Sequence, residues 1–261
     1  MIKSIIEFIT AIQNDLVKWE TGTIPWFRGE SGDEPPLRPK IANYGTSEEN
    51  HLLQSFRRKA GGLANVPDRE HTDMWLFLAQ HYGVPTRLLD WTEGALHALY
   101  FAINRGNSDP RVYMLNSRRL NDFAGSKTHP PNYPLSWVKG GGLYVALAWQ
   151  NRGLNEPQQI QGNQIGLNLD IPIALPAIYQ DQRMIAQRSC FTIHGTQLEP
   201  MQNILRENDI ELMECLLEYK IDVQAKRSLI SNLSMLGVSA ATIFPDLDHL
   251  AKDLCSELEG L

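Results

Sequence analysis

Apolar residues recur every three or four positions in some segments of the chain and alternate with polar residues in others. The helical spacing is clearest at residues 4–20, where Ser4 is a suitable N-cap, and at residues 224–236, where Gly237 ends the pattern. Runs rich in β-branched and aromatic residues are typical of strands. The pattern predicts helices at 4–20, 47–60, 68–81, 95–102, 180–187, 224–236 and 246–258, and strands at 23–30, 111–115, 166–173, 190–194 and 220–223, while 211–217 fits either.

These helices and strands do not alternate regularly along the chain, which argues against a doubly wound parallel sheet. The order instead predicts an α+β fold in which a small, mostly antiparallel sheet is surrounded by helices. Residues 125–142 are rich in Pro and Gly and are expected to form a loop. No internal repeat or linker divides the chain, so we expect residues 1–261 to form a single domain.

Composition limits the classes of partner. The formal net charge of −6 disfavours generic binding to a nucleic-acid backbone, although a local basic patch remains compatible with it. The three cysteines, Cys190, Cys215 and Cys255, are too scattered for a disulfide framework or a zinc site. No stretch is apolar and long enough to span a bilayer, and no secretory signal opens the chain. We therefore expect a cytoplasmic protein without a membrane anchor or a resident metal.

Residues 80–102 carry the most informative pattern in the chain, because Arg87 and Asp90 stand there among apolar and aromatic neighbours. A lone buried charge is unfavourable, so the two side chains are expected to contact each other or the backbone of a shared loop. Thr92 is a good N-cap and Glu93 suits the first turn of the helix that follows. A polar loop on a helix N-terminus suits an anionic ligand, but an Arg–Asp pair in a loop is more often a purely structural staple.

Well-known catalytic motifs are missing from the sequence. It holds no phosphate-binding Gly-Lys-Ser/Thr loop, no dinucleotide-binding glycine motif, no nucleophile elbow and no His-Glu-x-x-His. The histidines lack metal-ligand spacing, so His81, His97 and His194 are interpreted as structural residues. Cys190 beside Phe191 is typical of an inert core residue rather than a nucleophile.

Four separate segments resemble the FRG domain family, which is named after a Phe/Tyr-Arg-Gly signature. The signature matches residues 26–29, Trp-Phe-Arg-Gly. The longest block matches residues 81–92, His-Tyr-Gly-Val-Pro-Thr-Arg-Leu-Leu-Asp-Trp-Thr, with 98–102 downstream. A third block resembles residues 183–195, from Arg183 and Gln187 to the following strand, and a fourth resembles 244–248, Phe-Pro-Asp-Leu-Asp. The resemblance spans most of the chain.

The order of these blocks is similar to the layout of ADP-ribosyltransferases, which place an Arg or His early, an aromatic-rich segment next and a Glu or Gln on a late strand. The resemblance implies an ADP-ribosyltransferase-like fold and an enzyme that uses NAD as its substrate, such as a bacterial toxin or a phage-defence effector, with the acceptor left unspecified. It implies that Arg28 and Gln187 are catalytic. The residues implied to bind the nucleotide are Arg28, Tyr82, Thr86, Arg87, Asp90 and Tyr100.

Two features, one of chemistry and one a departure from the family pattern, keep a second interpretation open. Gln187 brings no charge to a transition state, and Ser189 stands where the family usually has Gly. The same pocket could therefore belong to a nonenzymatic module that binds a nucleotide or a partner. Arg28 likewise fits either a ligand-binding residue on a strand that faces a cleft or a buried arginine paired with Asp90.

Overall fold

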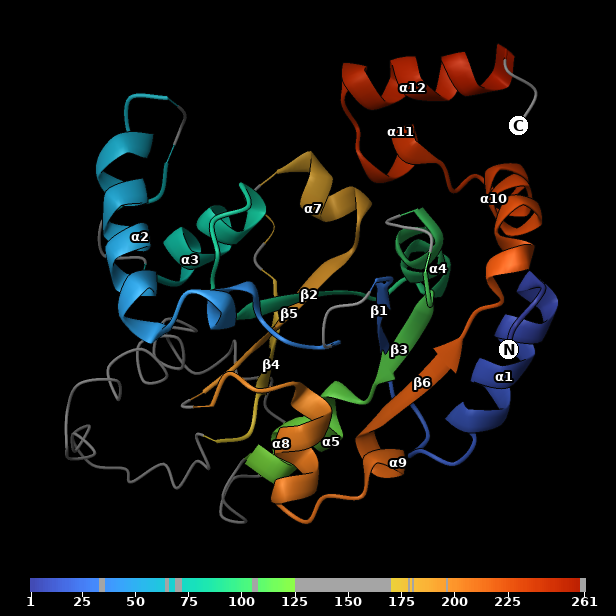
Figure 1. Ribbon diagram of the computed structural model, residues 1–261, viewed down its shortest axis with the longest axis horizontal. Coiled ribbons are helices and arrows are strands. Elements are labelled where there is room, and N and C mark those ends of the chain that lie inside the picture. The colour runs from blue at the N-terminus through green and yellow to red at the C-terminus, as the bar shows by residue number, and fades with distance from the viewer. Residues whose placement is uncertain are drawn as a thin grey trace.

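Six antiparallel strands form the centre of the protein in the computed structural model (Figure 1). Their order across the sheet is β4-β5-β2-β1-β3-β6. The structure describes residues 1–32, 36–63, 66–68, 72–104, 108–124, 170–177, 179, 181–195 and 197–258, so the expected loop at 125–142 lies outside the described residues. The strands are β1 (Trp26–Glu30), β2 (Leu88–Thr92), β3 (Arg111–Leu115), β4 (Ile173–Pro176), β5 (Ser189–Ile193) and β6 (Leu216–Lys220).

Eleven α-helices surround this sheet in the described part of the chain, which confirms the predicted α+β class. They are α1 (Ile5–Leu16), α2 (Thr46–Ala60), α3 (Thr72–His81), α4 (Ala95–Asn104), α5 (Ser117–Ala124), α7 (Gln182–Ala186), α8 (Met201–Glu207), α9 (Leu212–Cys215), α10 (Lys226–Met235), α11 (Ala240–Ile243) and α12 (Leu247–Leu258). Two short 3₁₀ helices, η1 (Lys40–Asn43) and η3 (Val223–Ala225), complete the described elements. None of the described helices has the length and hydropathy needed to cross a membrane.

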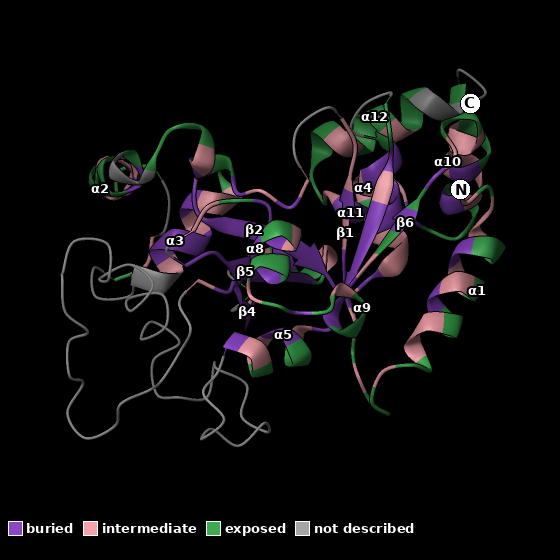
Figure 2. Cartoon of the chain, turned by 60° about the horizontal axis from the view of Figure 1, so that its bottom comes forward, coloured by how far each residue is buried: buried purple, intermediate pink, exposed green. Residues whose placement is uncertain are grey.

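The alternation of side chains along β1 divides the core between the two faces of the sheet. Phe27 packs with buried residues of α1, α4 and α10, whereas Trp26 packs with buried residues of α5 and α8. Arg28 therefore shares a face with Trp26 and points away from Phe27, as the period of two predicts. Figure 2 shows the central strands as largely buried and much of α12 as exposed.

Local expectations fail where tertiary pairing overrides the local pattern. Residues 88–92 were expected to form a polar loop before a helix, but they form β2, which pairs with β5 along its whole length. The predicted strand at 220–223 is wrong beyond Lys220, because β6 ends there and η3 begins at Val223. Helices α5 and α8 were not predicted. Their short apolar stripes become visible only once the sheet that they cover is known.

Gly29 lets α4 approach β1 closely. A Cβ atom at this position would lie 1.9 Å from the carbonyl oxygen of Ala98 and 2.5 Å from the backbone nitrogen of Ala102. Both atoms belong to helix backbone, which cannot move aside as a flexible side chain can. The glycine of the Trp-Phe-Arg-Gly segment is thus explained by packing, and Arg28 beside it is held on a strand that α4 covers on the opposite face.

We predict that Gly29→Ala lowers the free energy of unfolding by about 1–3 kcal/mol or more, because overpacking against backbone forces strand and helix apart. Urea denaturation of the variant measures the change. Gly61→Ala is the matched control, since a Cβ there meets no atom within 4 Å. An unchanged stability for Gly29→Ala would contradict the packing explanation.

Candidate functional site

A line of polar side chains joins the end of α3 to strands β2 and β1. The Thr86 hydroxyl donates to Gln80 Oε1 at 2.5 Å, and Gln80 Nε2 donates to Asp90 Oδ2 at 2.9 Å. Arg28 Nη1 then donates to the Asp90 carbonyl oxygen at 2.6 Å and lies 3.8 Å from Asp90 Oδ2. The structure therefore brings together three of the sequence-predicted site residues, Arg28, Thr86 and Asp90.

Arg28 is the cation of this group, and hydrogen bonds to Glu30 and Asp90 hold its guanidinium in place. Its Nε donates to Glu30 Oε1 at 2.5 Å, and Glu30 Oε2 accepts from the backbone N–H of Leu37 at 3.0 Å. Burial acts to lower the pKa of Arg28, but Glu30 and Asp90 outweigh it, so the net pKa is raised and the guanidinium stays charged. The Asp90 side chain is 57% exposed whereas that of Arg28 is 16% exposed, so Asp90 is the partner that a ligand can replace.

Arg87 makes a different contact from the one predicted: it pairs with Glu49 of α2, not with Asp90. Its side chain is fully buried, with Nε 3.1 Å from Glu49 Oε2. The Glu49 carboxylate also accepts from the Arg87 backbone N–H at 2.9 Å, and Nη1 donates to the carbonyl oxygens of His194 and Gly195. The staple interpretation is thus correct for Arg87, although its partner is wrong, because an acidic residue in the first turn of α2 looks like an ordinary helix charge in the sequence.

We predict that Glu49→Ala destabilises the protein by about 3–5 kcal/mol, because the buried guanidinium of Arg87 loses its counter-charge. Asp90→Ala, at an exposed carboxylate, is expected to cost no more than about 1 kcal/mol. Thermal and urea unfolding of the two variants distinguish the roles. Equal losses, or a larger loss for Asp90→Ala, would contradict this assignment.

Gln187 lies at the C-cap of α7, directly before β5. Its carbonyl oxygen accepts from the Thr92 hydroxyl at 2.7 Å, which connects it to β2. Its side-chain Nε2 is buried and has no hydrogen-bond partner among the described residues. Arg188 takes the left-handed conformation with φ 48°, so the backbone turns there and Ser189 starts β5.

The third and fourth sequence blocks meet in space. Arg183 of α7 lies over the ring of Phe244 with its Cζ atom 4.8 Å from the centroid. Phe244 in turn stacks on His249 of α12 at 4.4 Å. The C-terminal helices therefore contact the short helix α7, whose C-cap is Gln187.

Neither tyrosine of the predicted site forms a hydrogen bond or ring contact with Arg28 among the described residues. Tyr82 is 63% exposed and contacts the rings of His81 and Phe56. Its neighbour His81 lies 3.3 Å from Asp181, the N-cap of α7. Tyr100 is buried in the core on the α4 side of the sheet, and burial together with Asp253 raises its pKa. Tyr82 can therefore reach a ligand from solvent, whereas Tyr100 is enclosed.

Buried titratable residues flank β2 on its β5 side. Burial lowers the pKa of His194 to about 3, the positive charge of Arg28 acts in the same direction, and the backbone of Glu199 opposes both. Burial, with Glu93 and Asp90, raises the pKa of the Cys190 thiol well above its usual value. His194 is neutral and Cys190 is protonated at neutral pH, so neither is suited to serve as a charged catalytic group.

The lowered pKa of His194 makes the free energy of unfolding depend on pH. The unfolded chain takes up a proton at His194 near pH 6.5, whereas the folded protein does so only near pH 3, so stability falls as the pH drops between these values. The free energy of unfolding lost through His194 reaches about 5 kcal/mol once the pH has fallen to about 3. We predict a shallower loss of unfolding free energy between pH 6.5 and 4.5 for His194→Gln than for the wild type. Parallel slopes would show that His194 is not buried in its neutral form.

Sequence reasoning missed Glu30, Gln80 and Glu49. The first two stand next to recognised blocks, so their proximity was the available signal, whereas nothing in the sequence links Glu49 to Arg87. No cluster of three or more His, Cys, Asp or Glu side chains fit for a metal occurs among the described residues.

Residues 24–111 match the family model of the FRG domain. The match runs from just before β1 to the first residue of β3, so it contains Arg28, Thr86, Arg87 and Asp90 and leaves Gln187 outside. Searches of curated proteins and of solved structures found no significant match to the chain.

Proposed function

The chain carries an FRG domain at residues 24–111, and from that premise we propose that it is an NAD-using enzyme of the ADP-ribosyltransferase kind. Arg28 and Gln187 are its catalytic residues in this proposal. NAD is the substrate, and its ADP-ribose moiety is the group transferred. The acceptor is a separate question, to which the assay below is directed.

The observation that supports the proposal is the adjacency of β1, β2 and β5 in the sheet. The Arg28 guanidinium donates to the carbonyl oxygen of Asp90 on β2. The backbone carbonyl oxygen of Gln187 accepts from the hydroxyl of Thr92 on the same strand. Two residues along a strand span about 7 Å, so the two predicted catalytic residues attach to neighbouring points of one strand. This separation is of the size of a ribose with its attached phosphate.

The chemistry required of these residues is limited and specific. Cleavage of the bond between nicotinamide and ribose builds positive, oxocarbenium-like charge on the ribose. Arg28 offers its charge and its remaining N–H groups to a phosphate or to ribose hydroxyls, once the Asp90 carboxylate 3.8 Å away has been displaced. The exposed ring of Tyr82 offers a stacking surface for nicotinamide. The Gln187 amide both donates and accepts hydrogen bonds, so it can hold a ribose hydroxyl.

Gln187 brings no negative charge to stabilise the oxocarbenium ion, and this favours slow or acceptor-dependent turnover over rapid NAD hydrolysis. The same observation supports the second candidate, a module that binds a nucleotide without turnover. Glu30 and Asp90, the two carboxylates beside Arg28, are both engaged by it, and Glu93 is paired with Arg188. None of the three takes the missing role while these pairs persist.

We predict measurable nicotinamide release or ADP-ribose transfer by the wild type when protein and nucleic-acid acceptors are supplied. Arg28→Gln is expected to lower the rate at least about a hundredfold, because it removes the charge on which phosphate binding depends. Gln187→Ala lowers the rate and Gln187→Glu raises NAD hydrolysis, since a carboxylate stabilises the developing charge. Arg58→Ala, an exposed arginine on α2, is the matched control with unchanged activity.

Each variant is first checked by circular dichroism and thermal melting, so that loss of fold is separated from loss of chemistry. NAD binding by calorimetry without nicotinamide release in any variant would leave the binding module as the function. Absence of both binding and transfer would overturn the proposal in either form.

A further inference from the structure

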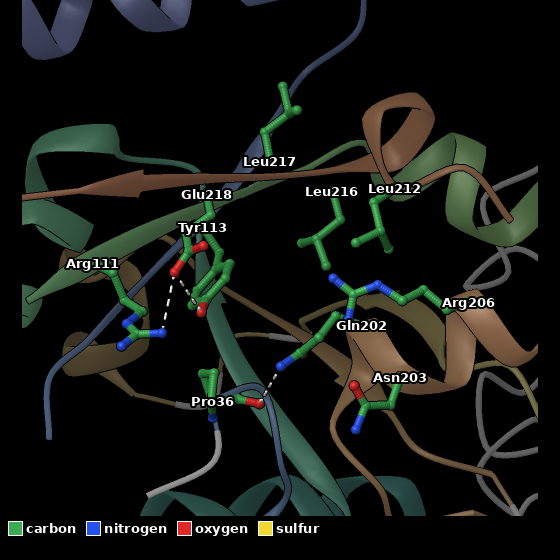
Figure 3. A pocket seen from close by; sticks show the side chains of 10 residues that line it. All are labelled: Pro36, Arg111, Tyr113, Gln202, Asn203, Arg206, Leu212, Leu216, Leu217 and Glu218. Atoms are coloured by element: carbon green, nitrogen blue, oxygen red, sulfur yellow. Dashed lines mark hydrogen bonds and ion pairs between the residues drawn. The ribbon is translucent and has the colours of Figure 1, made fainter. Parts of the chain in front are cut away.

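A pocket of ≈ 190 Å³ opens between helix α8 and strands β3 and β6, away from β2 and β5 (Figure 3). It is lined by Pro36, Arg111, Tyr113, Gln202, Asn203, Arg206, Leu212, Leu216, Leu217 and Glu218. Tyr113 is the register partner of Arg28 on one side and of Glu218 on the other. The pocket thus begins one strand beyond Arg28 on the same face of the sheet, and none of its residues takes part in the proposed NAD chemistry.

One wall of the pocket holds the Glu218 carboxylate, in which one oxygen accepts two hydrogen bonds and the other accepts none among the described residues. Glu218 Oε1 accepts from Arg111 Nη1 at 3.2 Å and from the Tyr113 hydroxyl at 3.3 Å. Within the described residues, Oε2 of the same carboxylate has no hydrogen bond. Burial raises the pKa of Tyr113 and the charge of Glu218 adds to this, so the hydroxyl keeps its proton and continues to donate. Glu218 is therefore fixed by two donors and can receive another from a ligand.

The opposite wall presents a second free acceptor and a cation. Gln202 Nε2 donates to the carbonyl oxygen of Pro36 at 3.3 Å, whereas its Oε1 is buried and has no partner among the described residues. Arg206, one turn further along α8, forms no ion pair within the part of the chain that the structure describes. Figure 3 shows its guanidinium extended toward Leu216 at the pocket. A buried acceptor and an unpaired cation together fit a ligand with N–H donors and a negative charge.

Apolar groups close the remaining two sides. Leu212 and Leu216 lie across the pocket from Pro36 (Figure 3). These apolar side chains offer contact to the face of a flat ring whose polar edge meets the hydrogen-bonding groups. The small volume suits a single base rather than a whole dinucleotide.

We propose that this pocket binds a free guanine nucleotide, with the base toward Glu218 and Gln202 and the phosphate toward Arg206. Guanine presents two adjacent N–H donors on one edge, which suits a carboxylate with an unused oxygen. Adenine presents a ring acceptor at the corresponding place and would leave that carboxylate facing a lone pair. The site is independent of the proposed NAD chemistry and does not require it.

The test is isothermal titration of the full chain with GMP, AMP and inorganic phosphate, each in separate runs. We expect GMP to bind at least about tenfold more tightly than AMP, because a hydrogen bond to a charged group is at stake. Glu218→Gln should weaken GMP at least about tenfold and narrow the difference from AMP. Arg206→Ala should weaken GMP and leave guanosine unchanged, while Arg58→Ala and Gln187→Ala should leave GMP affinity as in the wild type.

The outcomes separate this site from the proposed function. GMP affinity that persists in Gln187→Ala and in the presence of saturating NAD supports a distinct site even if no NAD turnover is found. Equal affinity for GMP and AMP, binding of phosphate as tight as that of GMP, or no heat of binding at millimolar GMP would each overturn it. Arg206→Ala alters an exposed side chain, so it reports on binding even if Glu218→Gln fails to fold.

Discussion

The buried ion pair between Arg87 and Glu49 fixes strand β2 against α2 and against the residues that follow β5, and the candidate site is built on this arrangement. Arg87 has the largest fully buried side chain in the described part of the chain, and its contacts come from α2 and from the residues just after β5. A guanidinium removed from water is tolerated only when nearly every donor finds an acceptor. These bonds fix the start of β2 against the end of β5. The Thr92–Gln187 bond connects the opposite ends of the same strands.

Arg28 and Arg87 belong to neighbouring sequence blocks but have opposite physical situations. Arg87 has no solvent exposure, so exchanging Glu49 for a ligand would strand a buried carboxylate. Arg28 keeps partial exposure, and one of its partners, Asp90, is mostly in water at 3.8 Å. Replacing that long contact by a phosphate costs little, because exposed ion pairs contribute little. Burial therefore indicates a structural role for Arg87, and it leaves Arg28 as the arginine to which the proposal gives ligand binding.

The local pattern predicted most helices and the strands β1, β3 and β5, because apolar period and capping residues act within a few positions. It could not predict β2, since the apolar run 88–92 is stabilised by pairing with β5 a hundred residues later. The prediction of Asp90 as the partner of Arg87 was wrong for the same reason, because the true partner Glu49 lies 38 residues away and nothing local marks it. Resemblance located Arg28 and the central block, whereas Gln80 and Glu30 emerged only from the contacts of their side chains.

The side-chain amide nitrogen of Gln187 is buried and has no hydrogen-bond partner among the described residues, although the carbonyl oxygen of the same residue is bonded to Thr92. A buried donor left unsatisfied is unfavourable unless a ligand or water completes it. The same reasoning applies to Arg183 Nε on the preceding turn. The segment before β5 thus contains the donors, and β1 contains the cation, that a ribose phosphate would bring into use.

The most direct test of the account is an NMR titration of the isotope-labelled chain with NAD, following the side-chain signals of Arg28 Nε–H and the Gln187 amide together. The account predicts that both signals shift with the same saturation curve, whereas the side-chain amide signal of Gln202 stays in place. Shifts confined to surface residues, or movement of only one of the two signals, would contradict the claim that β1, β2 and β5 form one nucleotide-binding site.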